Sequence, residues 1–415
     1  MIKKIFNLNI FILILLLEGI LRKYSESFYS ILIKDIFFIL LILFNSKVFN
    51  TTIIKFKVVK FYFFSLALLL LTSFLSFIYW DDQNIIVYLL GIREYLFYTP
   101  LIFIGYNYVF YCANEEKVLR AFLYLAIIIG LLGLFQFYKI LDSIYLMPIY
   151  DHLVSRSSSY GEIEYISSIF DVPERFAIFS LLLVIVSTYQ IIFSRKNKLI
   201  YFLSILIGLH SLLITARRIS FILGIISCII ILIFYNRINR VLNLIIVSLT
   251  TILVFLALYF MNTSISNTII DNSFGDGIYY FGNWTVEEFS KVYDVFNSFT
   301  GRFGSTSPGA VEVLGFNPLF VEIEAFWARA LFSIGGFISL LLFISLVFVD
   351  IDLFRRGNLH KSTLALIAGT FLFSVLVWNW KSGNYLIWSP LTLLVIGMGY
   401  GSIEKSSKRF NCKED

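Results

Sequence analysis

Charged side chains are scarce in this sequence. Asp, Glu, Lys and Arg together make up 14% of the 415 residues, whereas 59% are apolar and 18% are aromatic. A soluble domain carries about 25% charged residues, and a mean hydropathy of +0.85 is too high for a water-soluble fold. The composition therefore excludes a soluble enzyme, a secreted disulfide-bonded scaffold and a disordered chain.

Cysteine and histidine are equally sparse, with three of each. The cysteines form no CxxC pair, which argues against a disulfide framework; they are Cys112, Cys228 and Cys412. The histidines show no metal-ligand spacing, and no Gly-rich nucleotide-binding loop is present; they are His152, His210 and His360. We therefore expect no metal ion and no cofactor. We expect His210, alone in an apolar segment, to be a buried hydrogen-bonded residue.

Long apolar segments are the most prominent feature of the sequence. About 20 apolar residues in a helix cross the roughly 30 Å of a bilayer core, and the runs here are continuous, unlike the alternating strands of a β-barrel. We predict an all-α polytopic membrane protein in which residues 1–415 form a single membrane domain of about twelve transmembrane helices. The predicted spans are 5–21, 28–45, 61–79, 88–111, 118–140, 174–193, 199–216, 219–235, 241–260, 326–349, 363–380 and 385–400.

Lysine and arginine are distributed unevenly among the connections between these spans. Cytoplasmic loops of membrane proteins collect both residues. If the N-terminus is inside, most of the basic residues fall in short connections on that side, such as 46–60, 194–198 and 350–362. The charge bias and the even number of spans predict that both termini are cytoplasmic. The net charge of +6 follows from this bias, so we expect no nucleic-acid partner.

Two long connections lie on the side that this topology makes external. They comprise residues 141–173 and 261–325 and are rich in Asp, Glu, Tyr, Ser and Gly. Long loops held by a rigid scaffold are where binding and catalytic residues concentrate. We therefore expect function at the external face.

Adjacent arginines in an apolar region are the most informative feature of the sequence. Arg217 and Arg218 lie between the spans 199–216 and 219–235, on the expected external side, where a positive charge is no ordinary topological anchor. A guanidinium group binds phosphate in a bidentate manner and stays charged when it is desolvated. A phosphate-binding role is favoured, and snorkelling to the interface is the alternative.

Other charged residues stand near the same face. Arg93 and Glu94 lie just inside the external end of the span 88–111, where they either form a structural ion pair or leave Arg93 to hold an anion. Asp81 and Asp82 either cap a helix or bind a divalent metal. Further positive charge on this side comes from Arg156, Arg175, Arg302 and Arg329.

Four stretches, taken together, resemble the O-antigen polymerase and O-antigen ligase superfamily of the Wzy type. In order, they are Glu18-Gly-Ile-Leu-Arg-Lys with Lys34-Asp35, then Gly91-Ile-Arg-Glu-Tyr, then Thr215-Ala-Arg-Arg-Ile-Ser, then Glu322-Ile-Glu-Ala-Phe with Ser333-Ile-Gly-Gly. Arg218 matches the arginine of the family's Thr-x-Ser-Arg stretch, whereas Arg217 replaces its serine. The resemblance is a pattern of order and sidedness across most of the chain.

This resemblance implies a metal-independent glycosyltransferase of GT-C-like architecture in a bacterial inner membrane. The enzyme would transfer a glycan from undecaprenyl pyrophosphate to a sugar hydroxyl on the external, periplasmic face. Its partners would be that lipid-linked glycan, the bilayer and a chain-length regulator protein. Arg218 would help to neutralise the pyrophosphate, and Glu324 would accept the proton of the acceptor, with Glu322 as the alternative base. The other residues implied in binding the pyrophosphate and glycan are Arg217, Arg93, Arg156, Arg302 and Arg329.

Three alternatives stay open from the sequence. The ligase branch of the same superfamily is often associated with a histidine in the large external loop; residues 261–325 contain none, but His152 lies in the other long loop. A flippase or other transporter for lipid-linked oligosaccharide would usually show two pseudo-symmetric halves and short loops. A metal-dependent transferase would rely on Asp81 and Asp82.

Overall fold

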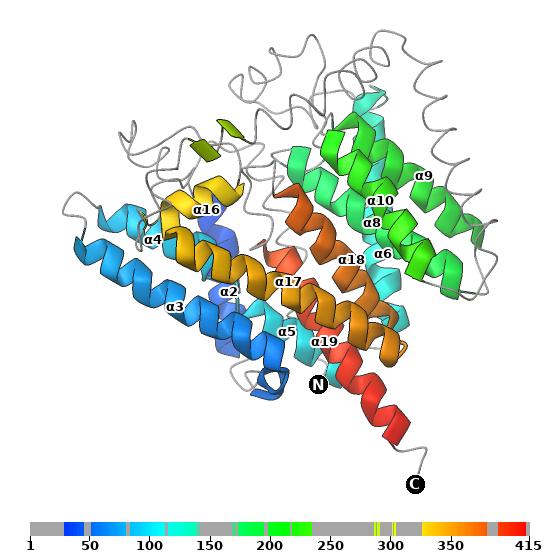
Figure 1. The fold of residues 1–415 in the computed structure, drawn as a ribbon. Coiled ribbons are helices and arrows are strands. Elements are labelled where there is room, and N and C mark those ends of the chain that lie inside the picture. The colour runs from blue at the N-terminus through cyan, green and yellow to red at the C-terminus, as the bar shows by residue number, and fades with distance from the viewer. Residues whose placement is uncertain are drawn as a thin grey trace. The chain divides into compact units, whose positions relative to one another are not determined.

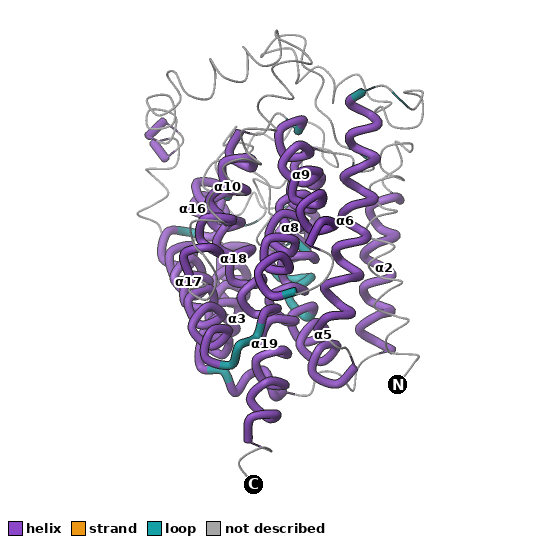
Figure 2. Tube along the Cα trace, turned by 90° about the vertical axis from the view of Figure 1, so that its right-hand side faces the viewer, coloured by secondary structure: helices purple, strands orange, loops and turns teal. Residues whose placement is uncertain are grey.

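The computed structural model describes the part of the chain that forms helices, together with a few loop positions. The described residues are 29–44, 51–79, 84–112, 115–138, 140, 168, 170, 173–194, 198–215, 218–234, 286–287, 289–290, 301, 303, 326–379 and 389–411. Almost all of them are helical (Figure 2), and none of them is in a strand. The chain divides into two compact units, Met1–Ser46 with Cys112–Asp276 and Lys47–Tyr111 with Gly277–Asp415.

The first unit is a bundle of closely packed helices. Helices α6, α8 and α9 contact one another, and α10 packs on α8 and α9. Glycines stand at the crossings: Gly133 of α6 faces the Phe176 ring, and Gly208 of α9 faces Val184. Small residues let membrane helices approach closely. The helices of this unit are α2 (Tyr29–Phe44), α6 (Glu115–Phe137), α8 (Pro173–Phe193), α9 (Lys198–Ile214) and α10 (Arg218–Phe234).

The second unit is built around three neighbouring helices, α17, α18 and α19. Helix α3 packs along α17, α5 packs along α19, and α16 lies on α17 (Figure 1). The elements of this unit are η2 (Thr51–Lys55), α3 (Lys57–Tyr79), α4 (Ile85–Tyr95), α5 (Leu101–Asn107), the π-turn η3 (Tyr108–Cys112), α16 (Phe326–Ile334), α17 (Gly336–Leu359), α18 (Thr363–Trp378) and α19 (Pro390–Asn411).

Glycines also set the closest helix pair of the second unit, α5 with α19. A methyl group on Gly397 would overlap the Ile102 carbonyl, and one on Gly401 would overlap the Tyr106 carbonyl. Gly105 of α5 abuts the Leu394 carbonyl in the same way. Gly397 and Gly401 form the GxxxG spacing that lets two backbones touch in a bilayer.

Among the described residues, four helices are long and apolar enough to cross a membrane: Lys57–Tyr79, Glu115–Phe137, Glu174–Phe193 and Gly336–Leu359. Shorter apolar helices accompany them at Lys198–Ile214, Ile219–Ile231 and Thr363–Trp378. Large apolar side chains of α3, among them Phe64, Leu71 and Ile78, are more than half exposed, as expected of a surface that faces lipid. The described part of the chain is therefore all-helical, and its long apolar helices indicate a multi-pass membrane protein.

Several predicted spans differ from the helices found. The segment 88–111 is interrupted at 96–100 between α4 and α5, because Pro100 lacks an N–H and disfavours helical geometry in the residue before it. The predicted span 326–349 is broken at Gly335. The membrane helix α17 begins at Gly336 and continues to Leu359, ten residues beyond the predicted end. Helix α19 spans Pro390–Asn411 instead of 385–400. The predicted spans 5–21 and 241–260 lie outside the described residues, and the count of twelve crossings stays a prediction.

The second unit has two distinct ends. Helix α3 rises about 30 Å between Phe56 and Ser76, roughly the thickness of a bilayer core. At the "basic end", Phe56 stacks near Tyr400 of α19, with ring centroids 4.7 Å apart, and under the Arg356 guanidinium of α17. At the "loop end", Ser76 hydrogen-bonds the Gly301 carbonyl. The cytoplasmic segments predicted around 46–60 and 350–362 thus meet at one end of this unit.

Candidate functional site

Backbone-to-backbone packing of two glycines organises the loop end of the second unit. Gly301, from the segment 261–325, lies against the break between α16 and α17: a methyl group on it would come within 2.5 Å of the Gly335 nitrogen and the Phe332 oxygen. Gly335 itself has φ 84° and ψ 158°, a region open essentially to glycine alone. Gly335 and Gly336 of the stretch Ser333-Ile-Gly-Gly lie at this break.

Aromatic rings secure the same loop end. Phe303 is fully buried, and its ring centroid lies 5.5 Å from that of Tyr88 and 5.8 Å from that of Tyr95, both on α4. Tyr88 also meets Phe77 of α3 at 4.9 Å. Residues 301 and 303 of the long connection 261–325 are therefore anchored on α3, α4 and the α16–α17 break.

The loop end carries two of the predicted arginines. Arg93 lies in the last turn of α4, and Arg329 lies in α16; both side chains are partly exposed. Helices α4 and α16 both contact α3. Helix α3 therefore connects the helix that carries Arg93 with the helix that carries Arg329. Glu94 follows Arg93 and points about 100° away around the helix, and its Oε2 atom is shielded from solvent.

In the first unit, the predicted arginine pair coincides with a break between helices. Helix α9 ends at Ile214 and α10 begins at Arg218. The hydroxyl of Thr215 donates a 2.7 Å hydrogen bond to the Leu212 carbonyl, which satisfies one acceptor at the end of α9. The first turn of α10 contains no acidic residue, so the positive end of its helix dipole is not offset by a carboxylate there.

The same end of the first unit holds a polar pair that involves His210. Its Nε2 atom lies 2.9 Å from the hydroxyl of Tyr138, just past the end of α6. Phe137 meets the imidazole edge-on, with ring centroids 6.3 Å apart. The prediction that His210 is hydrogen-bonded is confirmed, but the side chain is only partly buried.

The segment 141–173 is also anchored at this end of the first unit. The backbone N–H of Ser168 donates to Gln136 Oε1 at 2.9 Å, and the Ser168 hydroxyl donates to the Ile129 carbonyl at 2.9 Å. Phe170 joins an apolar cluster with Ile129, Phe176 and Ile214. Sequence analysis did not single out Gln136, Tyr138 or Ser168, because the partners are far apart in the chain.

A second polar network, also not found from the sequence, occupies the basic end of the second unit. Arg356 Nε donates to both carboxylate oxygens of Asp352, at 2.8 and 3.0 Å, and the Tyr400 hydroxyl donates to Asp352 at 3.2 Å. Lys405 donates to the Val109 carbonyl at 3.1 Å. The spacing of Asp352 and Arg356 is the usual i,i+4 pairing, but their link to α19 depends on the tertiary fold.

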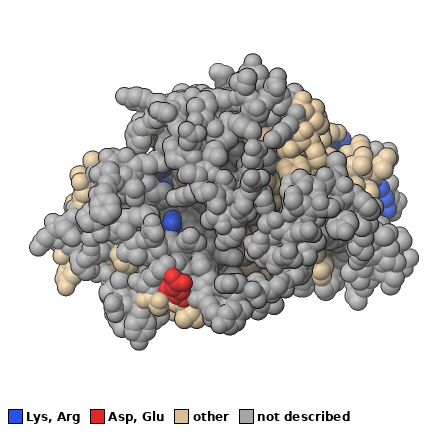
Figure 3. Space-filling view, turned by 90° about the horizontal axis from the view of Figure 1, so that it is seen from above, with Lys and Arg blue, Asp and Glu red and all other residues tan. Residues whose placement is uncertain are grey.

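Several predicted site residues lie outside the described residues, as do the two acidic residues of the metal-dependent alternative. They are Arg156, Arg217, Arg302, Glu322, Glu324, His152, Asp81 and Asp82. Arg218 is described only as the first residue of α10. Within the described ranges, no group of three or more His, Cys, Asp or Glu could hold a metal ion. Seen from above the view of Figure 1, only a few described charged side chains reach the surface (Figure 3).

Comparison with known proteins finds no matching family model and no matching curated protein.

Proposed function

We propose that this protein is a surface-polysaccharide polymerase of the O-antigen type. It transfers a glycan from undecaprenyl pyrophosphate to a sugar hydroxyl on the external face of a bacterial inner membrane. Support comes from the multi-pass helical architecture, from the four stretches that resemble the Wzy superfamily, and from arginines placed beside the anchored ends of both long connections.

One observation supports the proposal most strongly. Gly301 and Phe303 of the connection 261–325 pack on the helices α4 and α16, which carry Arg93 and Arg329. A long polar loop secured beside partly exposed arginines at a membrane-helix end suits an anionic lipid-linked sugar. Arginine supplies bidentate charge neutralisation to phosphate oxygens.

The chemistry requires a displacement at the anomeric carbon of the donor. The acceptor oxygen forms a bond to that carbon, the bond from the carbon to the pyrophosphate oxygen breaks, and the pyrophosphate leaves with the electron pair. Arg218, Arg217 and Arg93 stabilise the charge that develops on the leaving group. Glu324, or Glu322 in its place, takes the proton of the acceptor hydroxyl. Arg156, Arg302 and Arg329 extend the positive surface toward the glycan.

The proposal includes a topology and an architecture. About twelve spans of GT-C-like arrangement, cytoplasmic termini and periplasmic connections at 141–173 and 261–325 would put the donor and the acceptor on one face. Single cysteines at Asn283 and Lys198 test this in intact cells. An impermeant thiol reagent should label position 283 and leave position 198 unmodified; labelling of position 198 would reverse the orientation.

The catalytic test uses membranes that carry the full chain and a lipid-linked repeat unit. Arg218→Lys keeps the charge but loses the guanidinium fork, so donor binding should weaken and turnover should fall. Glu324→Gln should still bind donor but transfer it more slowly, by the roughly 10²–10⁴-fold typical of a lost general base. Arg355→Lys, at an exposed position of α17, is the matched control and should leave activity unchanged.

The result also separates the alternatives. Polymer formed without metal in the presence of EDTA supports the polymerase. Transfer to lipid A core that depends on His152 identifies a ligase, and loss of activity in Asp81→Ala with rescue by magnesium identifies a metal-dependent transferase. Movement of the lipid-linked glycan across the membrane without bond formation identifies a flippase. Normal polymer yield from Glu324→Gln would exclude Glu324 as the base.

A further inference from the structure

A carboxylate lies within a membrane-spanning helix of the second unit. Asp350 belongs to α17 and is 7% exposed. It lies two residues, about 3 Å along the helix axis, from Asp352 of the basic end. A buried carboxyl group costs free energy unless it is neutralised or paired.

The two oxygens of Asp350 are incompletely satisfied. The backbone of Phe373 on α18 is the one polar group of that helix that acts on the carboxyl group. Its Oδ1 atom is buried and has no hydrogen-bond partner among the described residues. A buried acceptor without a partner is uncommon in folded proteins and requires an explanation.

The charged groups on neighbouring elements are engaged elsewhere or lie at the surface. On α17 itself, Arg356 is paired with Asp352 and Arg355 is exposed. Helix α18 contains no ionisable side chain. On α19, Lys405 bonds the Val109 carbonyl, and Lys408 is near Glu404 at 3.9 Å.

The two remaining neighbours of α17 add no counterion. On α3, Lys57 and Lys60 are exposed in its first turn. On α16, Arg329 belongs to the loop end, at the opposite end of α17 from Asp350. No described cation therefore forms an ion pair with Asp350.

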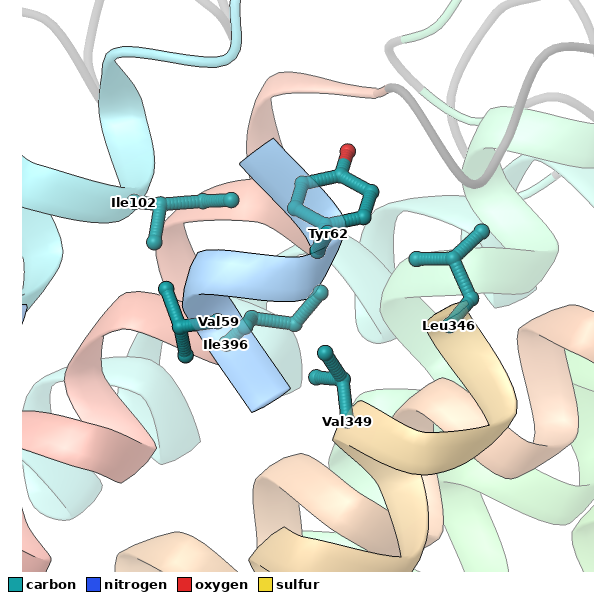
Figure 4. Close-up of a pocket in the computed structure, with 6 residues that line it drawn as sticks. All are labelled: Val59, Tyr62, Ile102, Leu346, Val349 and Ile396. Carbon is teal, nitrogen blue, oxygen red and sulfur yellow. The ribbon is translucent and has the colours of Figure 1, made fainter. Parts of the chain in front are cut away.

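The nearest cavity does not solvate the carboxylate. It is lined by apolar side chains of α3, α5, α17 and α19 together with the ring of Tyr62 (Figure 4). Val349 lines it, but the next residue, Asp350, does not. A sodium ion would require several oxygen ligands, and no group of three or more acidic or other metal-binding side chains exists in the described part of the chain. A proton needs only the one oxygen that is left without a partner.

We propose that Asp350 is a proton-binding site in the interior of the second unit, next to the polar network of the basic end. Tyr400 donates a hydrogen bond to Asp352, which lies two residues along α17 from Asp350. Exposure then increases along the network, from Asp352 at 12% to Arg356 at 39%. This sequence of polar groups leads from the buried acid to the surface. The proposal does not depend on the polymerase function.

Carbodiimide labelling tests the protonated state directly. Dicyclohexylcarbodiimide is apolar and reacts with a protonated carboxyl group: the acid proton moves to a carbodiimide nitrogen, and the carboxyl oxygen bonds to the central carbon. Peptide mass spectrometry of the full-length protein at neutral pH should find the adduct on Asp350 and not on Asp352, which is paired with Arg356. A water-soluble carbodiimide should leave the buried Asp350 unmodified.

Infrared spectroscopy provides a second, reagent-free measurement. Wild-type protein should show the carbonyl stretch of a protonated carboxyl group, and Asp350→Asn should lose it, whereas Asp352→Asn should retain it. After a rapid rise in pH, Tyr400→Phe should lose that band more slowly than wild type, because the hydroxyl that bonds Asp352, next to Asp350, is gone.

Two results would overturn the proposal. An infrared spectrum unchanged by Asp350→Asn would show that this carboxyl group is ionised. Protection of Asp350 from labelling by sodium chloride, but not by potassium chloride, would assign the site to sodium instead of a proton. Neither result bears on glycan transfer, which is measured separately with lipid-linked donor.

Discussion

The two ends of the second unit are held together by different chemistry. At the basic end, an ion pair, a tyrosine hydroxyl and a lysine–carbonyl bond join α17, α19 and the end of α5. At the loop end, two glycines bring backbones together and aromatic rings fill the space around Phe303. Interactions of charged side chains therefore hold the helices together at the basic end. At the other end, packing fixes the fold and the arginines stand on partly exposed surfaces.

The two ends therefore differ in the contacts that hold them. At the basic end, Arg356 neutralises Asp352 of its own helix. Arg93 and Arg329 stand where apolar and backbone contacts support the fold. The comparison predicts that loop-end packing contributes more to stability than the basic-end ion pair does, and three substitutions test that order.

Removing the Phe303 ring should have the largest effect. The side chain is fully buried against Tyr88 and Tyr95, and Phe→Ala at such a site costs about 3–5 kcal/mol. Thermal unfolding of the purified protein in detergent should show a clear loss of stability for Phe303→Ala. Phe337→Ala is the control, because Phe337 is 53% exposed and its removal should change the unfolding temperature little. Equal losses in both variants would contradict packing as the cause.

Adding a methyl group at Gly301 should have an intermediate effect. The new Cβ would meet backbone atoms of Phe332 and Gly335 that cannot rotate away, and overpacking of this kind costs about 1–3 kcal/mol. Gly369→Ala is the matched control, since its Cβ would meet only the Phe354 ring, at 3.2 Å. Within a helix, Ala also gains up to about 1 kcal/mol over Gly. If Gly301→Ala is as stable as Gly369→Ala, the glycine contact does not organise the loop end.

Breaking the basic-end network should have the smallest effect. Asp352→Asn removes the charge that Arg356 and Tyr400 bind, and we expect a loss of about 1–2 kcal/mol because hydrogen bonds to charged groups are lost. Partial exposure of Arg356 reduces the cost by solvent screening. The exposed Arg120–Glu116 pair provides the control: Glu116→Gln should cost less than Asp352→Asn in the same unfolding assay. A loss from Asp352→Asn that exceeds that from Phe303→Ala would reverse the comparison.

Much of the helical framework could be predicted from the sequence. The starts or ends of α3, α6, α8, α9 and α10 fall within a few residues of the predicted spans, because long apolar runs have one stable conformation in a bilayer. The breaks at 96–100 and at Gly335 were not predicted. Hydropathy averages over many residues and does not register a single proline or a glycine at positive φ.

The candidate site was predictable only in part. Arg93 and Arg329 stand out in an apolar sequence by their charge alone. Gly301, Phe303, Gln136 and Tyr138 do not, since glycine and aromatic residues are common throughout this chain. Their significance depends on partners many residues away, such as Ser76 for Gly301 and His210 for Tyr138.

By itself, the sequence determined that this is a helical membrane protein, because scarce charge and long apolar runs leave a chain no other way to satisfy its backbone hydrogen bonds in lipid. It also identified the arginines as candidate functional residues, because a charged side chain is costly in an apolar region of a membrane protein. Only the tertiary structure decided that Asp352 pairs with Arg356 and Tyr400 and that one oxygen of Asp350 is buried without a hydrogen-bond partner. Pairing requires two side chains to come within a few ångströms, and residues as distant as Asp352 and Tyr400 meet only after the helices have packed.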